Sequence, residues 1–399
     1  MLLVRLQFEP GRDEVIFSAT PAAPAVFVLR GPEEASEPYV SKTANLRRRL
    51  VRLLGPAEER SRRLNLCERV ATIEYTLTGS DFESGFLLYQ VLRQAFPKAY
   101  AARLRLRFAP LVKLHLDNKY PRASITTRLG RLGGKSMYYG PFPSRTAAEK
   151  FANDSLDFFK MRRCVDDLNP DPAFPGCIYS EMRMCRAPCF KGCTDDEYQA
   201  EVERVQAYFV TRGHSLLRDL ETERERASAN LEFETAAAAH ARVEKLLPVV
   251  NPLPEIVQRL DRLSAVIVQH CATPECVALF RVQAGRITGP RDFLVQPPAE
   301  HAARSQSMES RLAQKLAEFQ PETPGSATET MEHLAILKRW YYRSSRVGEI
   351  FLADDKGVLP MRRMVRGIAR VFRGEKAEPN SPALTAQLAA EPRGEPGGD

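Results

Sequence analysis

The stretch from residue 164 to residue 193 reads CVDDLNPDPAFPGCIYSEMRMCRAPCFKGC and holds five of the eight cysteines of the chain. The gaps between successive cysteines are 12, 7, 3 and 3 residues. Proline and glycine recur between them, so this loop has too little apolar surface to fold alone. Thiolates are soft ligands, and four of them around one centre suit zinc or an iron–sulfur cluster. The spacing therefore favours a metal centre over buried reduced thiols or disulfides.

The overall composition is that of a globular protein, with 44% hydrophobic residues in a chain of 399, long enough for two or three domains. Lys and Arg number 58 against 50 Asp and Glu, a net charge of +8, which fits a polyanionic partner without requiring one. No apolar run approaches the roughly 20 residues that a membrane span needs, and no signal peptide is visible. We therefore expect a cytoplasmic protein without membrane contact, in a compartment where disulfides are rare.

Two helices are well marked in the first hundred residues. Leucines at i, i+4, i+7 and i+8 from Leu46 predict a helix over residues 45–54, and Gly55-Pro56 ends it. Ser80 and Glu83 have the spacing of a capping box, which predicts a second helix from there to about residue 94. Apolar or alternating runs predict short strands at residues 2–8, 14–17, 25–29, 38–41 and 72–78.

This order of elements, with Tyr39 three residues before Lys42 and an arginine-rich first helix, resembles the GIY-YIG nuclease domain. The closer resemblance is to the N-terminal part of the bacterial excinucleases of the UvrC family. Short motifs in the same order extend it along the chain. They are Lys119-Tyr120-Pro121, Tyr139-Gly140-Pro141-Phe142-Pro143-Ser144, Arg163-Cys164, Cys185-Arg186-Ala187-Pro188-Cys189 and Leu231-Glu232-Phe233-Glu234.

The resemblance implies a nuclease site that hydrolyses a phosphodiester with one divalent metal, Mg²⁺ or Mn²⁺. Tyr39, Lys42 and Arg49 stand at the positions of the family's second tyrosine, its lysine and its arginine. Phe27 stands at the first tyrosine, and Leu88 stands at the glutamate that holds the metal. Because the metal ligand is missing, we expect a degenerate site that is catalytically inactive.

No other carboxylate on the second helix is expected to replace the missing glutamate. The chain has no Asp or Glu between residues 84 and 116. Glu83 would lie about 140° around the helix from Leu88, and Asp81 would share its face but lie about 10 Å away along the axis. Neither would reach the same metal ion.

The basic first helix is the candidate DNA-binding element. Seven arginines lie between residues 47 and 63, against only Glu58 and Glu59. Arginine offers several donors to a phosphate, so Arg47, Arg48 and Arg52 are predicted to contact the DNA backbone. The alternative is an ordinary solvated face.

The resemblance also assigns the cysteine loop and the helices that follow it. Cys164, Cys177, Cys185 and Cys189 stand at the positions of four family cysteines thought to hold a [4Fe-4S] cluster, which leaves Cys193 supernumerary; Zn²⁺ is the alternative. Residues 195–248 resemble the UVR motif, a helical hairpin that docks UvrB in the family. Leu231, Phe233 and Glu234 at its turn are the predicted partner-binding residues, and a self-contained hairpin is the alternative.

The predicted fold class is α+β multidomain: a small GIY-YIG-like α/β sandwich, a Cys-rich metal loop, an antiparallel helical hairpin and a C-terminal α+β domain. In the family an RNase-H-like domain and a helix-hairpin-helix region follow, and we expect neither in the 44 residues after Asp355. The expected boundaries are 1–22 (N-terminal strand extension), 23–102 (degenerate nuclease domain), 103–162 (connecting strands and helix), 163–194 (cysteine cluster), 195–248 (hairpin), 258–372 (linker-like α+β domain) and 376–399 (disordered tail).

Three functions are compatible with these features. The first is a UvrC-like DNA-binding protein of nucleotide excision repair without incision chemistry of its own. The second is an active endonuclease of excision repair making a single, 3′-side type cut. The third is a DNA-binding regulator that depends on the iron–sulfur cluster.

Overall fold

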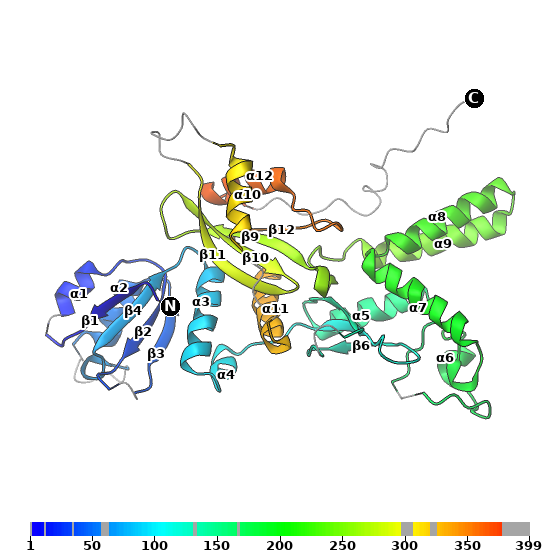
Figure 1. The fold of residues 1–399 in the computed structure, drawn as a ribbon, viewed down its shortest axis with the longest axis horizontal. Coiled ribbons are helices and arrows are strands. Elements are labelled where there is room, and N and C mark those ends of the chain that lie inside the picture. Colours follow the sequence, from blue (N-terminus) through cyan, green and yellow to red (C-terminus); the bar gives the residue numbers. More distant parts are fainter. Residues whose placement is uncertain are drawn as a thin grey trace.

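The computed structural model describes residues 2–11, 13–33, 36–56, 64–130, 134–165, 168–296, 306–319 and 325–376. Within these ranges the chain forms three four-stranded antiparallel sheets and a helical pair that projects from them (Figure 1). The predicted α+β multidomain class is therefore confirmed. The expected disordered tail lies outside the described residues from position 377 onward, as do Arg60, Arg62 and Arg63.

The first sheet has the order β1-β4-β2-β3. Helices α1 and α2 pack against one of its faces, where Phe27 of β2 and the predicted leucines from Leu46 to Leu54 are buried. The Asn45 side chain caps α2 by accepting the backbone N–H of Arg48 at 2.9 Å. These elements are β1 (Val4–Gln7), α1 (Asp13–Ala19), β2 (Ala25–Arg30), β3 (Tyr39–Thr43), α2 (Leu46–Leu54) and β4 (Thr72–Leu77).

Of the two strands predicted in the first 22 residues, one forms and the other is a helix. Residues 14–17, predicted as a strand, lie in helix α1, because Phe17 is buried in the same core as Phe27 while Glu14 and Val15 face solvent. The other predicted strand forms as β1, but it pairs with β4 at the edge of the first sheet, with Val4 opposite Tyr75. This segment is thus part of the first sheet.

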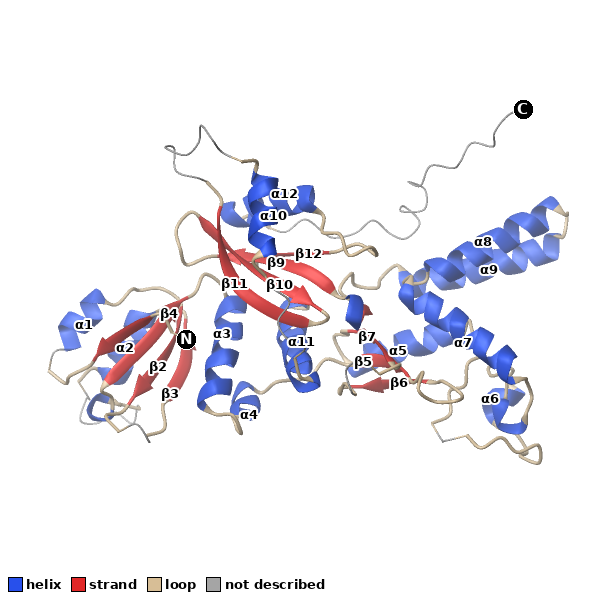
Figure 2. Ribbon diagram, in the orientation of Figure 1, coloured by secondary structure: helices blue, strands red, loops and turns tan. Residues whose placement is uncertain are grey.

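The central sheet has the order β11-β10-β9-β12 and is buried on both faces (Figure 2). Ile267 of β9 joins the core formed with α3 and α11, whereas Val266 and Val268 join the core formed with α10 and α12. The elements are α3 (Asp81–Ala95), β9 (Ser264–His270), β10 (Cys276–Gln283), β11 (Arg286–Leu294), α10 (Met308–Ala317), α11 (Ala327–Tyr341), β12 (Glu349–Leu352) and α12 (Met361–Arg373).

Helix α3 connects the first sheet to the central one. Its predicted N-terminus at Ser80 is confirmed: the Ser80 hydroxyl accepts the backbone N–H of Glu83 at 3.1 Å. Its apolar face, however, packs away from the first sheet. The Phe82 ring lies 5.0 Å from that of Phe280 and 5.1 Å from that of Trp340. The second helix of the expected nuclease domain therefore shares its core with the C-terminal part of the chain.

The third sheet, β6-β5-β7-β8, lies beside the cysteine loop and the helical hairpin. Helix α9 continues two residues past the predicted end of the hairpin at residue 248, to Val250. The elements are α4 (Tyr100–Leu104), β5 (Leu111–Leu114), β6 (Ala123–Thr126), β7 (Met137–Gly140), α5 (Arg145–Leu156), α6 (Ile178–Glu181), α7 (Asp195–Val210), α8 (His214–Ala229), α9 (Phe233–Val250) and β8 (Gln258–Arg259), with 3₁₀ turns at Cys67–Arg69, Pro188–Phe190 and Leu260–Arg262.

Candidate functional site

Two of the three residues expected in the remnant nuclease site lie in direct contact. Arg49 Nη2 on α2 donates to the Tyr39 hydroxyl on β3 at 2.8 Å. Phe27 lies opposite Ser41 in the neighbouring strand, fully buried, with its ring 6.1 Å from that of Tyr39. A phenylalanine there offers no hydroxyl to a water or a metal ion. Of the two tyrosine positions expected in the site, only that of Tyr39 therefore carries a phenol.

The third expected residue, Lys42, forms an ion pair with Asp81 at the start of α3. Arg343, which follows α11, pairs with the other oxygen of the same carboxylate. Partial burial pushes the pKa of Asp81 upward, but the hydrogen bonds and charges of Lys42 and Arg343 outweigh it and hold this pKa below its usual range. Asp81 is therefore an ionised carboxylate held between two cations.

Leu88, which the sequence resemblance places at the family's glutamate position, is half-buried on α3. Glu83 is buried instead at the start of the helix, where its carboxylate accepts the Gly79 N–H at 2.8 Å. Burial raises the pKa of Glu83 to about 7. In this structure Glu83 thus caps the helix, and Asp81 is held by two cations.

The three arginines predicted to bind DNA differ in their surroundings. Arg47 donates through Nε to the Thr20 carbonyl at 2.7 Å and through Nη2 to the Ser18 carbonyl at 3.1 Å, so it ties α1 to α2. Arg48 and Arg52 lie at i and i+4, both exposed, and neither forms an ion pair with any described residue. Of the three, these two have guanidinium groups free to meet a phosphate.

The cysteine loop brings four thiols within electrostatic reach of one another. Burial raises the pKa of Cys185 to about 11, and the thiols of Cys164, Cys189 and Cys177 add to the shift. Even so, among the residues that the structure describes, no group of three or more His, Cys, Asp or Glu side chains could hold a metal ion as the side chains stand. The loop thus gathers the four predicted ligands into one region without arranging them around a metal.

The groups around this loop suit an anionic centre. Arg162 is buried, and its Nη1 donates to Cys164 Sγ at 3.4 Å, while the Ala187 N–H donates to Cys185 Sγ at 3.3 Å. The Nε atoms of Arg163 and Arg186 are buried, with no hydrogen-bond partner within the described ranges. A tetrathiolate centre carries negative charge, and hydrogen-bond donors beside its sulfurs stabilise it. The donor set therefore fits a four-cysteine metal centre.

The turn of the helical hairpin exposes two large apolar side chains. Leu231 is 71% exposed and Phe233 is 68% exposed, and Glu234 beside them also faces solvent. Leu231 has a φ of +59°, which closes the turn between α8 and α9. These two apolar side chains therefore do not contribute to this chain's own core.

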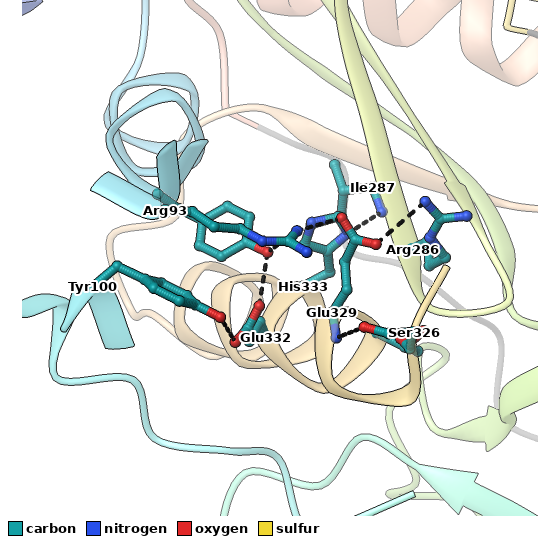
Figure 3. Close-up of polar contacts among 10 residues, drawn as sticks. Arg93, Tyr100, Arg286, Ile287, Ser326, Glu329, Glu332 and His333 are labelled. Carbon is teal, nitrogen blue, oxygen red and sulfur yellow. Dashed lines mark hydrogen bonds and ion pairs between the residues drawn. The ribbon is translucent and has the colours of Figure 1, made fainter. Parts of the chain in front are cut away.

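A polar network between α3 and α11 is not visible in the sequence. The hydroxyls of Tyr89 and Tyr100 donate to the two oxygens of Glu332 at 2.8 and 2.5 Å (Figure 3). Arg93 pairs with Glu329, and Glu329 also lies 3.6 Å from Arg286 of β11. The residues of α3 and those of α11 are separated by more than 200 positions, so no local pattern predicts these contacts.

His333 belongs to the same network and borders a cavity of about 350 Å³. Its Nδ1 accepts the backbone N–H of Ile287 at 3.0 Å. Burial lowers the pKa of His333 to about 4, which keeps the imidazole neutral. The network fixes α3 to α11 and β11.

One family of known proteins matches part of the chain. Residues 110–208 match the family described as "UvrC/Cho excinuclease, middle domain". This segment begins before β5 and ends in α7, so it contains strands β5, β6 and β7 of the third sheet and the cysteine loop, whereas β8 lies outside it. No solved structure matches the chain.

The relatives named UvrABC system protein C cover more of the chain. The protein of Pseudomonas syringae pv. syringae is 30% identical over 325 residues, which is 80% of this chain and 51% of the relative. That of Methanothermobacter thermautotrophicus is 28% identical over 301 residues, 74% of this chain and 49% of the relative. The chain thus spans about half the length of these curated relatives. The predicted resemblance is confirmed: the chain is UvrC-like.

None of the helices that the structure describes is both long and apolar enough to cross a bilayer.

Proposed function

We propose that this chain is a UvrC-like DNA-binding protein of nucleotide excision repair that does not cut DNA itself. The proposal is carried by Leu88, which stands where the sequence resemblance puts the family's metal-binding glutamate. The carboxylate that pairs with Lys42 is Asp81, and its charge is neutralised by Lys42 and Arg343. A hydrophobic side chain offers a divalent metal no ligand, and without the metal the attacking water is not activated near neutral pH.

DNA binding in this proposal begins at α2. Arg48 and Arg52 lie on one exposed helix face and carry fixed positive charge. Each phosphate contact that releases a counterion steepens the salt dependence of binding, with a slope of about −0.9 per contact. The double variant Arg48→Gln/Arg52→Gln should therefore bind duplex DNA more weakly and lower the magnitude of the slope by about 1.8.

A matched control for that experiment lies on α12. Arg362 and Arg366 are also exposed at i and i+4 and form no ion pair with any described residue, so Arg362→Gln/Arg366→Gln removes the same charge elsewhere. Binding measured by fluorescence anisotropy across a salt series compares the two pairs. Wild-type protein that shows no salt-dependent binding to DNA would refute the proposed function.

The cysteine loop is proposed to hold a [4Fe-4S] cluster, with Zn²⁺ as the competing metal. Cys164, Cys177, Cys185 and Cys189 would be its ligands, and Arg162 would donate a hydrogen bond to the first of them. Purification under nitrogen with iron, sulfide and zinc analysis tests the assignment. We expect bound metal in the wild-type protein and its loss in Cys185→Ser, whereas Cys193→Ser should retain it. Metal-free wild-type protein would contradict the assignment.

The hairpin is proposed to dock a UvrB-like protein through its turn. The exposed side chains of Leu231 and Phe233 carry this step, because their burial at an interface would be favourable by about 2 kcal/mol each. Phe233→Ala should weaken binding to a UvrB-like partner without changing the helix content. Equal binding of the wild type and this variant would exclude the turn as the docking site.

A further inference from the structure

The C-terminal part of α11 and the segment that links α4 to β5 place several cations side by side. Lys338 and Arg339 lie in the last turn of α11, and Arg107 lies in the linking segment. The Lys338 Nζ donates to the Phe108 carbonyl at 3.2 Å, which holds the ammonium group next to Arg107. We call Arg107, Lys338, Arg339 and Arg343 the α11 basic band.

Most cations of this band have no acidic partner among the described residues. Arg107, Lys338 and Arg339 form no ion pair within the described part of the chain, and Arg107 and Arg339 are exposed. Burial lowers the pKa of Lys338, and the neighbouring charge of Arg107 lowers it further. A solvated lysine would swing away from a like charge, whereas Lys338 is held beside Arg107 by a backbone carbonyl. Such an arrangement is stabilised by an anion bound between the two cations.

The band continues around α11 toward the first sheet. Arg339 follows Lys338 in the last turn of α11, and Arg343, just beyond the end of the helix, reaches Asp81 at the start of α3. Arg343 shares Asp81 with Lys42 of β3. The cations thus run from the linking segment across α11 to the edge of the remnant nuclease site. Figure 1 shows α11 between α3 and the third sheet, with the linking segment passing beside it.

We propose that the α11 basic band binds the phosphate backbone of duplex DNA and extends the contact that α2 makes. This inference rests on the proposed function, since it adds a second surface for the same DNA. Lys338 and Arg339 are consecutive residues in the last turn of α11, and Arg343 lies just beyond the end of the helix. Phosphates on one DNA strand follow each other at about 3.4 Å along the duplex axis, so cations placed in a row can each meet one of them. A row of fixed cations suits a regular polyanion.

The test compares two charge-matched pairs in the full chain. Lys338→Gln/Arg339→Gln removes two charges from the band, and Arg362→Gln/Arg366→Gln removes two from α12. The cores of α11 and α12 lie on opposite faces of the central sheet, so the two pairs report on different surfaces. Duplex binding by fluorescence anisotropy is measured across a salt series for both. We expect the band variant alone to lower the magnitude of the salt slope by about 1.8.

A charge-conserving variant separates electrostatics from folding. Lys338→Arg/Arg339→Lys should keep the wild-type slope, because phosphate contacts by point charge survive the exchange. The fluorescence of the neighbouring Trp340, the only tryptophan, shows whether α11 remains packed in each variant.

Each other result overturns the inference. An equal loss in the band and α12 variants would mean that net charge, not this surface, governs binding. A band variant that binds as wild type, while Arg48→Gln/Arg52→Gln loses affinity, would remove the inference and leave the proposed function standing. No salt-dependent binding by the wild type would remove both.

Discussion

Replacing Tyr89 and Tyr139 separately with phenylalanine applies one chemical change at two equally buried sites. Both side chains are 1% exposed, and each variant loses only a hydroxyl. The Tyr89 hydroxyl donates to Glu332 Oε2 at 2.8 Å and accepts from Arg93 Nη1 at 3.0 Å (Figure 3). The Tyr139 hydroxyl has no hydrogen-bond partner among the described residues. The two variants should therefore change stability in opposite directions.

The magnitude follows from what each hydroxyl satisfies. A hydrogen bond to a charged group contributes about 1.5–3 kcal/mol, and Glu332 is buried with one oxygen left without its donor in Tyr89→Phe. Arg93 is partly exposed and regains water, so its lost bond adds little. We expect Tyr89→Phe to lower the free energy of unfolding by about 2–3 kcal/mol. Tyr139→Phe removes an unsatisfied buried polar group and should be neutral or stabilise by about 1 kcal/mol.

Urea unfolding followed by Trp340 fluorescence measures the effect of Tyr89→Phe at the contact between α3 and α11. The Trp340 ring lies 5.1 Å from that of Phe82, so its emission reports the packing of α3 on α11. Far-UV circular dichroism follows both variants in parallel, because several domains need not unfold together. Equal changes in the two variants, or a stabilised Tyr89→Phe, would refute the reasoning from hydrogen-bond satisfaction.

Two further predictions concern the start of α3. Gly79→Ala should destabilise the protein by about 1–3 kcal/mol, since a Cβ there would lie 2.3 Å from the His270 carbonyl oxygen. Gly85 lies within α3, and a Cβ there would have no atom within 4 Å apart from its chain neighbours and the backbone of the helix itself, so Gly85→Ala should stabilise the protein by about 0.5–1 kcal/mol. Equal urea midpoints for Gly79→Ala and Gly85→Ala would contradict the close contact at Gly79. The pKa of Glu83 is raised from 4.5 to about 7, so the folded state binds its proton more tightly and stability falls as pH rises from about 4.5 to 7. Glu83→Gln should therefore be more stable than wild type, by up to about 3 kcal/mol, above this range and equally stable below it; unfolding curves with a pH-independent difference would exclude this titration.

Local sequence patterns correctly predicted the helices and strands that are determined by residues close together in the sequence. The leucine spacing of α2, the alternation of β4 and the cap at Ser80 each depend on neighbours in sequence, and each forms as expected. Residues 14–17 were misassigned because three consecutive apolar residues suit a short strand as well as a helix. Burial of Phe17 against the first sheet decides for the helix, and this contact is not visible in the sequence.

The candidate sites were predictable to the extent that they depend on residue identity. The absence of a carboxylate at Leu88 could be seen in the sequence, as could the cysteine spacing. The partners of the remaining groups could not be seen, because they lie far away along the chain. Arg343 meets Asp81 across 262 residues, and Glu332 meets Tyr89 across 243. The hydrogen bonds of Arg47 to two backbone carbonyls could not be predicted either, because they depend on the position of α1.

Incision is the measurement that tests the central claim most directly. Purified protein is incubated with a lesion-bearing duplex, Mg²⁺ or Mn²⁺ and a UvrA–UvrB pair, and the DNA is examined for a strand break. We expect no break from the wild type, together with salt-dependent DNA binding that depends on Arg48 and Arg52. A metal-dependent break that disappears in Arg49→Ala would contradict the account, because it would show that a group other than the residue at position 88 holds a catalytic metal.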